Sequence, residues 1–197
     1  IREAKADATK SLKSCNYKMK PAALKEALLP YYASIEDRDK GVHLIKNTKL
    51  ADELVRIVFS KEQKREHIVA SWVLERLITN AKHLNLYPYF TEFLKTFQYQ
   101  THESKRRPFA KLLYHHCQVK EHRDQLSAKQ IDIIIACCFD TLLDAKKVAP
   151  KAYALKTIVY FKNHNDWVED ELKSYIEKEL PTSSAAFKSS LRQILPF

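Results

Sequence analysis

Hydrophobic residues recur along this chain at the spacing that places them on one face of an α-helix. Two sets follow the spacing i, i+4, i+7, i+8: Leu50, Leu54, Ile57 and Val58, and Val168, Leu172, Tyr175 and Ile176. Between Ile131 and Leu143 the apolar residues surround the helix axis instead. We expect that segment to be a central helix covered on most sides, because it is too long for a buried strand.

The same pattern extends over nearly the whole chain and predicts no strand. Short connections join the predicted helices, as in antiparallel helical hairpins. Ser127 with Gln130 forms a capping box at the start of one helix, and Asp166 with Glu169 repeats the pattern. The predicted helices span residues 1–14, 21–33, 38–46, 49–60, 64–82, 87–99, 104–118, 128–144, 148–164, 167–180 and 184–195.

The chain contains a single glycine, Gly41. Dinucleotide-binding fingerprints, P-loops and nucleophile elbows need glycines where the backbone turns sharply or approaches phosphate, so the sequence excludes these classes of enzyme. The helices must also end without glycine. We expect Asn163 and Asn165 to take the left-handed conformation that glycine usually supplies after a helix.

A weak repeat accompanies the alternation of helices. Three basic residues near the starts of predicted helices are 41 residues apart: Arg65, Arg106 and Lys147. An uneven register fits comparably and aligns Trp72, Phe109 and Tyr153. A period near 40 predicts an all-α, HEAT-like α-α superhelix of stacked antiparallel helix pairs.

Five segments combine helical patterning with fixed aromatic and proline positions: ASWVLERLI, LYPYFTEFLKTF, KRRPFAKLL, VAPKAYALKTIVYF and ELPTSSAAFKSSLRQIL. Together they resemble a family of short bacterial HEAT-like repeat proteins. The resemblance covers residues 40–195, with Trp72 and the Phe187-Lys188 pair among its features. It implies the HEAT-like fold and no established activity.

Some members of that family carry the label adenylosuccinate lyase. The segment PTSSAAFKSS resembles the flexible serine loop of that enzyme, but it lacks the loop's glycine, methionine, first proline and closing Asn-Pro. More distantly, the architecture resembles that of DNA alkylation-repair glycosylases. Those proteins hold duplex DNA against a basic concave face, and their active-site pattern has no residue-by-residue match here.

Charge and cysteine content bear on the partners and the cellular location of the protein. The formal net charge is +10 and the sequence pI is about 9.3, which attracts polyanions and also favours solubility. Four cysteines are expected to be reduced core residues: Cys15, Cys117, Cys137 and Cys138. Because neither a signal peptide nor a membrane span is evident, we predict a cytoplasmic protein. We expect one domain over residues 1–197, with N-terminal helices in residues 1–35.

The sequence predicts no catalytic residue, no metal and no cofactor. The densest set of potential metal ligands is His115, His116, Cys117 and His122. Adjacent residues on a helix point about 100° apart, so His115 and His116 do not ligate one tetrahedral ion together. The acidic run 169–171 begins a helix and complements its dipole, and Ser183 and Ser184 precede a helix that serine commonly caps.

Positive charges recur near the starts of successive predicted helices. If the repeats stack, equivalent positions line one edge, and these charges merge into a stripe suited to tracking phosphates. A solvated edge without a partner is the alternative interpretation. The predicted nucleic-acid-binding residues are Arg65, Lys105, Arg106, Arg107, Lys111, Lys146, Lys147 and Lys151.

These observations favour a non-enzymatic helical-repeat binding module, because solenoids present extended surfaces without a catalytic constellation. Its expected partner is a protein or a nucleic acid. The main alternative is a nucleic-acid-binding or DNA-repair-like protein that uses the basic stripe, in which case Arg106→Glu weakens binding. A remote alternative is a protein that carries the adenylosuccinate lyase label without the lyase motif.

Overall fold

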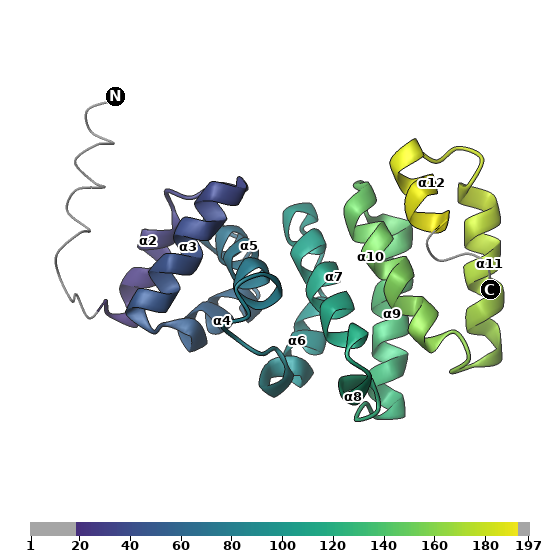
Figure 1. Cartoon of the computed structure of the whole chain (residues 1–197), viewed down its shortest axis with the longest axis horizontal. Coiled ribbons are helices and arrows are strands. Elements are labelled where there is room, and N and C mark those ends of the chain that lie inside the picture. The colour runs from purple at the N-terminus through teal and green to yellow at the C-terminus, as the bar shows by residue number, and fades with distance from the viewer. Residues whose placement is uncertain (1–18, 193–197) are drawn as a thin grey trace.

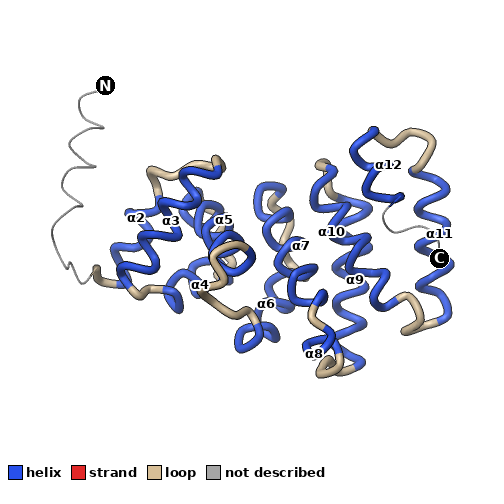
Figure 2. Tube along the Cα trace, in the orientation of Figure 1, coloured by secondary structure: helices blue, strands red, loops and turns tan. Residues whose placement is uncertain are grey.

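The computed structural model describes residues 19–192, and this part of the chain is helical and contains no strand (Figure 1; Figure 2). The all-α prediction is therefore confirmed for these residues. The 3-10 helices within residues 19–192 are η2 (Pro21–Ala23), η3 (Tyr87–Tyr89) and η4 (Val159–Phe161). The α-helices are α2 (Leu24–Leu28), α3 (Ile35–Thr48), α4 (Ala51–Phe59), α5 (Arg65–Thr79), α6 (Phe90–Phe97), α7 (Glu103–Gln118), α8 (Lys120–Arg123), α9 (Ala128–Asp144), α10 (Val148–Ile158), α11 (Asp166–Glu179) and α12 (Ala185–Arg192).

The helices form two layers that run along the length of the molecule (Figure 1). In the first layer α3, α5, α7, α10 and α12 follow one another, each packed against the next. The second layer contains α4, α6, α9 and α11, of which α4 packs against α5 and α9 against α10. The open face is our name for the side of the first layer that points away from the second layer.

Buried hydrophobic side chains form one cluster between the layers, from Leu24 in α2 to Leu191 in α12. Gly41 belongs to α3, where an added Cβ would overlap the Cγ2 atom of Val73 in α5. The single glycine therefore allows close packing of two first-layer helices and does not serve a left-handed turn.

The predicted and observed helices agree best where a local cap defines the boundary. Ser127 and Gln130 form the predicted capping box, and α9 spans residues 128–144 as expected. The second predicted capping box, at Asp166 and Glu169, is wrong. Asn165 is the N-cap of α11 and makes no side-chain capping bond. Glu169 instead lies 3.0 Å from the Nζ of Lys173.

Other boundaries depend on neighbouring helices. The helix predicted over residues 21–33 ends at Leu28, and the short helix α8 was not predicted. The prediction for residues 1–14 lies outside the described residues. The α9 helix is buried on one side only, since Leu143 is 70% exposed, so the prediction of a surrounded central helix is wrong.

The left-handed positions also differ from the prediction. Among described residues other than glycine, positive φ angles occur at Lys49 and Lys82, with φ of 58° and 48°. Lys49 is the C-cap of α3, and its N–H donates to the carbonyl oxygen of Ile45. Asn163 and Asn165 do not take this conformation, because α10 continues into η4 and then turns without it.

Helices of the first layer recur at a spacing near 40 residues. Helices α5, α7 and α10 begin at residues 65, 103 and 148, so successive starts are 38 and 45 residues apart. Arg65 begins α5, Arg106 is the fourth residue of α7, and Lys147 precedes α10. The three residues of the 41-residue register therefore do not occupy equivalent positions.

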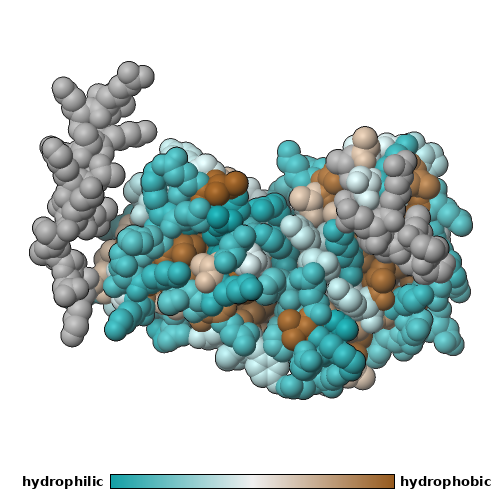
Figure 3. Space-filling model, viewed as in Figure 1, coloured by the Kyte–Doolittle hydropathy of each residue, from teal (hydrophilic) through white to brown (hydrophobic). Residues whose placement is uncertain are grey.

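The visible surface is mostly hydrophilic, with separate hydrophobic patches (Figure 3). Among residues 19–192 no helix has both the length and the hydropathy needed to span a membrane.

Candidate nucleic-acid interface

Lys105 does not fit the prediction that it lies on a basic edge. Its side chain is 0% exposed, and its Nζ donates to the carbonyl oxygen of Val58, 3.2 Å away in the last turn of α4. Burial lowers the pKa of Lys105 to about 8. This lysine therefore satisfies a free carbonyl at a helix end and does not reach a phosphate on the surface.

Arg65 and Arg106 also have partners within the fold. The Arg65 guanidinium donates to the carbonyl oxygens of Leu29 and Tyr31, at 3.2 and 3.1 Å, beyond the end of α2. Arg106 is 8% exposed, and its Nη2 lies 3.5 Å from a carboxylate oxygen of Asp144. We therefore expect Arg106→Glu to place a second carboxylate beside Asp144, which makes it a poor probe of surface binding.

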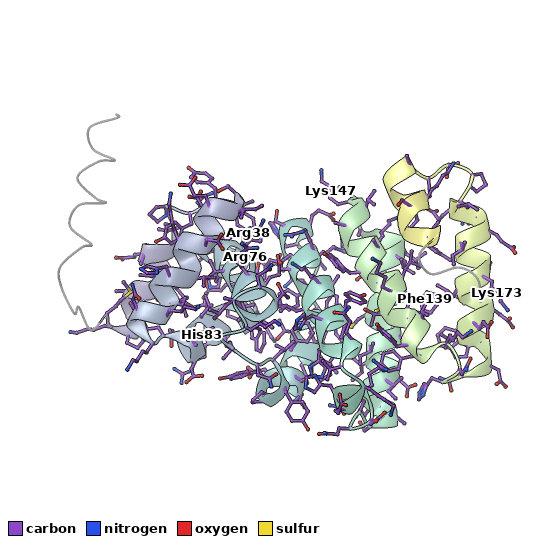
Figure 4. The ribbon with its side chains drawn as sticks, viewed as in Figure 1. Arg38, Arg76, His83, Phe139, Lys147 and Lys173 are labelled. Carbon is purple, nitrogen blue, oxygen red and sulfur yellow. The ribbon has the colours of Figure 1, made fainter. Side chains whose placement is uncertain are left out.

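Three predicted lysines lie near the start of α10: Lys146 and Lys147 precede the helix, and Lys151 lies in its first turn. Lys146 and Lys147 are exposed, and Lys147 lies apart from Arg38 and Arg76 in Figure 4. The Nζ of Lys151 lies 3.9 Å from the carboxylate of Glu179 in α11. The backbone N–H of Lys147 donates to the carboxylate of Glu103 in α7, 3.0 Å away, so acidic side chains lie among the basic ones at this edge.

Several basic side chains bond helix-end carbonyls instead. Arg123 donates to the carbonyl oxygens of Cys117 and Gln118, at 2.5 and 3.1 Å, at the end of α7. Lys105 and Arg65 make equivalent bonds at other helix ends. A chain with one glycine has few glycine caps, and long cationic side chains satisfy these carbonyls while complementing the helix dipole. Part of the net charge therefore has a structural role.

A cluster of charged side chains on the first layer surrounds Glu75 of α5. The Glu75 side chain is 0% exposed, and three cations from two neighbouring helices reach its carboxylate. Lys111 Nζ lies 2.5 Å from Oε1, while the Nη1 atoms of Arg107 and Arg38 lie 3.0 and 3.4 Å from Oε2. One buried carboxylate thus faces three positive charges, a formal surplus of two.

The surplus lies close to solvent on one side. The side chains of Arg38, Lys111 and Arg107 are 12%, 22% and 37% exposed. Next to them Arg76 donates two hydrogen bonds to Asp39, at 2.6 and 3.0 Å, and this donation lowers the pKa of Asp39. Figure 4 shows Arg38 and Arg76 on the adjacent helices α3 and α5. Because the Arg76 pair is neutral, it leaves the surplus around Glu75 uncompensated.

The open face continues from this cluster across α7 and α10. On α7 the residues that are not fully buried follow helical spacing, and Arg107, Lys111 and Tyr114 belong to that row. Tyr153 and Lys156 occupy the corresponding row of α10. The rings of Tyr114 and Tyr153 lie 5.8 Å apart, so the two rows meet. The open face therefore places cations beside aromatic rings.

Two of the histidines considered as metal ligands, His116 and His122, stack on each other. His116 is 2% exposed, and its ring lies between Phe90 and His122, with centroids 3.7 and 4.5 Å away. Burial, followed by the charges of His122 and His115, lowers the pKa of His116 to about 3. Neither ring nitrogen of His116 has a hydrogen-bond partner within the described segment.

Another group offers ligand atoms within 4.8 Å of one another: Glu62, Glu66 and His67. The Nζ atoms of Lys64 and Lys25 lie 3.0 and 3.9 Å from the carboxylate of Glu62. These lysines already compensate its charge, so the group resembles a surface ion-pair network more than a cation site.

Sequence reasoning identified Arg107 and Lys111 but missed Glu75 and Arg38. No local motif connects the four residues, because the contacts of Glu75 span 32 to 37 residues of sequence. These separations are close to the spacing between the starts of successive first-layer helices. A search for opposite charges one repeat apart is the signal that could have found the cluster.

Comparison of the chain with protein-family models, with curated proteins and with solved structures found no match.

Proposed function

We propose that this protein is a non-enzymatic, HEAT-like helical-repeat binding module whose open face binds nucleic acid. The observation that carries the proposal is the cluster at Glu75, where three cations share one buried carboxylate. Phosphodiester groups carry the charge and the acceptor oxygens that such a surplus attracts. A helical-repeat architecture would extend the contact over several phosphates. The free thiols of Cys117, Cys137 and Cys138 fit a cytoplasmic location, which we include in the proposal.

Glu75 has a definite role in this proposal. Arg38 and Arg107 come from different helices, and like charges so close together repel unless an anion lies between them. The buried carboxylate holds their side chains near one another before any ligand arrives. Preorganised cations lose less conformational entropy on binding a phosphate than freely rotating ones.

The test is fluorescence anisotropy with labelled DNA and RNA oligonucleotides at 50 and 200 mM salt. We expect the affinity to fall steeply as salt increases, as it does when several phosphates displace counterions. Lys156→Gln is the informative variant, because Lys156 has no carboxylate partner among residues 19–192 and its loss leaves the ion pairs intact. We expect weaker binding and a salt slope reduced by about 1.

Lys95→Gln is the matched control, since it also removes one lysine charge but from an exposed position of α6 in the second layer. It should bind like the original protein. Absence of binding at 50 mM salt, or equal losses in the two variants, would contradict the proposal. A protein partner, sought by pull-down, would then be the better hypothesis.

A further inference from the structure

Three tyrosines, one each from α7, α10 and η4, gather on the open face next to the Glu75 cluster. The ring of Tyr114 lies 5.8 Å from that of Tyr153 and 6.4 Å from that of Tyr160, the latter at an interplanar angle of 21°. Tyr160 remains 39% exposed. By contrast, the phenylalanines Phe93 and Phe109 stack inside the core. The tyrosine group therefore offers ring surface to a ligand.

Two cations lie against these rings. Lys156 Nζ is 5.9 Å from the centroid of Tyr114, and the guanidinium carbon of Arg123 is 4.4 Å from that of Tyr160. Neither cation has a carboxylate partner in the part of the chain that the structure describes. Their charges are held in place by rings and, for Arg123, by carbonyl oxygens, so they remain available to an anion.

The tyrosine group is continuous with the charged cluster. Tyr153 lies close enough to Arg107 and Glu75 for both charges to act on its hydroxyl. Arg107, Lys111 and Tyr114 lie four and three residues apart on α7, which places them on one face of that helix. Cations and partly exposed rings thus alternate along a single surface that crosses α7, α10 and η4.

This alternation matches the chemistry of an unpaired strand. In a duplex the faces of the bases are covered by their neighbours, whereas a single strand can place a base on an aromatic ring and its phosphates on nearby cations. We infer that the open face binds single-stranded nucleic acid, with phosphates on Arg107, Lys111 and Lys156 and unpaired bases stacked on Tyr114 and Tyr160. This inference rests on the proposed function and specifies its substrate class.

The experiment compares a single-stranded 20-mer, the matching duplex and an abasic single strand, in deoxy and ribo forms, by anisotropy at 50 mM salt. We expect the single strand to bind at least about tenfold more tightly than the duplex. Tyr160→Leu should weaken single-strand binding by roughly 5- to 100-fold and leave the duplex and the abasic strand nearly unaffected. The deoxy and ribo arms distinguish DNA from RNA as the source of the strand.

Tyr99→Leu is the matched control, because Tyr99 is 76% exposed but follows α6 in the second layer. Circular dichroism of both variants verifies folding. Equal affinity for single strand and duplex, with no effect of Tyr160→Leu, would overturn this inference and leave the proposed function standing if Lys156→Gln still weakened both. Absence of binding to every probe would remove the proposed function and this inference together.

Discussion

The indole N–H of Trp72 in α5 donates to the carbonyl oxygen of Ser104 in α7, at 3.0 Å. Residue 108 would normally donate to that carbonyl, four residues earlier in the helix, but Pro108 has no N–H. Trp72 therefore supplies the missing donor from the neighbouring helix. The bond joins two helices of the first layer at the edge of the Glu75 cluster.

Trp72→Phe should lower the free energy of unfolding by about 1 kcal/mol beyond the loss of packing, because the Ser104 carbonyl loses its donor. Pro108→Ala restores a backbone donor in the same place, so Trp72→Phe should cost less in that background. Urea unfolding of the two single variants and the double variant measures the coupling. Strict additivity would show that the indole bond does not replace the missing helical one.

Glu75→Gln should destabilise the protein by roughly 3 kcal/mol, because it leaves three partly buried cations without their shared carboxylate. Sulfate or phosphate at millimolar concentration should recover part of the loss by occupying the cluster. The measurement is the urea midpoint with and without sulfate. Glu171→Gln, at an exposed position of α11, is the control and should change stability by less than about 0.5 kcal/mol. A similar loss in both variants would contradict this account of Glu75.

How far the sequence predicts the structure depends on the range of the interactions. The start of α9 was predicted, because Ser127 and Gln130 are three residues apart and act on each other. The position of Lys105 was not, since periodicity defines the faces of α7 but not which neighbour covers each face. The helical pattern indicates which residues share a face of a helix, but the packing of neighbouring helices decides which of them are buried.

The candidate site shows the same limit. Arg107 and Lys111 were singled out because basic residues cluster locally in the sequence. Glu75 resembled any other acidic residue of an amphipathic helix, and its role appears only once α3, α5 and α7 stack. Likewise, no sequence pattern indicates that Arg123 bonds the carbonyl oxygens at the end of α7.

Lys105 should make stability depend on pH in the alkaline range. Its pKa is about 8 in the folded state, because of burial, and near the ordinary value of 10.5 when the chain unfolds. Between these values the unfolded state binds more protons, so the free energy of unfolding rises with pH, by up to about 1.4 kcal/mol per unit. From pH 8 to pH 10.5 we expect the free energy of unfolding of the original protein to rise relative to that of Lys105→Met, which lacks the titrating amine. A difference independent of pH would show that Lys105 titrates normally when folded.

His116 should make stability depend on pH in the acid range. Burial holds its pKa at about 3 in the folded state, against an ordinary value of 6.5, so the folded protein keeps the ring neutral. As pH falls below 6.5, His116 becomes protonated in the unfolded state but stays neutral in the folded state. The free energy of unfolding therefore decreases by up to about 1.4 kcal/mol per pH unit.

His116→Phe removes the titrating imidazole and keeps an aromatic ring against Phe90. The stability of this variant should therefore fall less steeply between pH 6.5 and pH 4 than that of the original protein. Urea unfolding across this range measures both slopes. The control is His43→Phe, which removes an imidazole from an exposed position of α3. An equal change of slope in the two variants would mean that the neutral, stacked state of His116 does not cause the acid sensitivity. A flatter slope in His116→Phe alone would show that His116 causes the acid sensitivity, because burial in the stack keeps its ring neutral in the folded state.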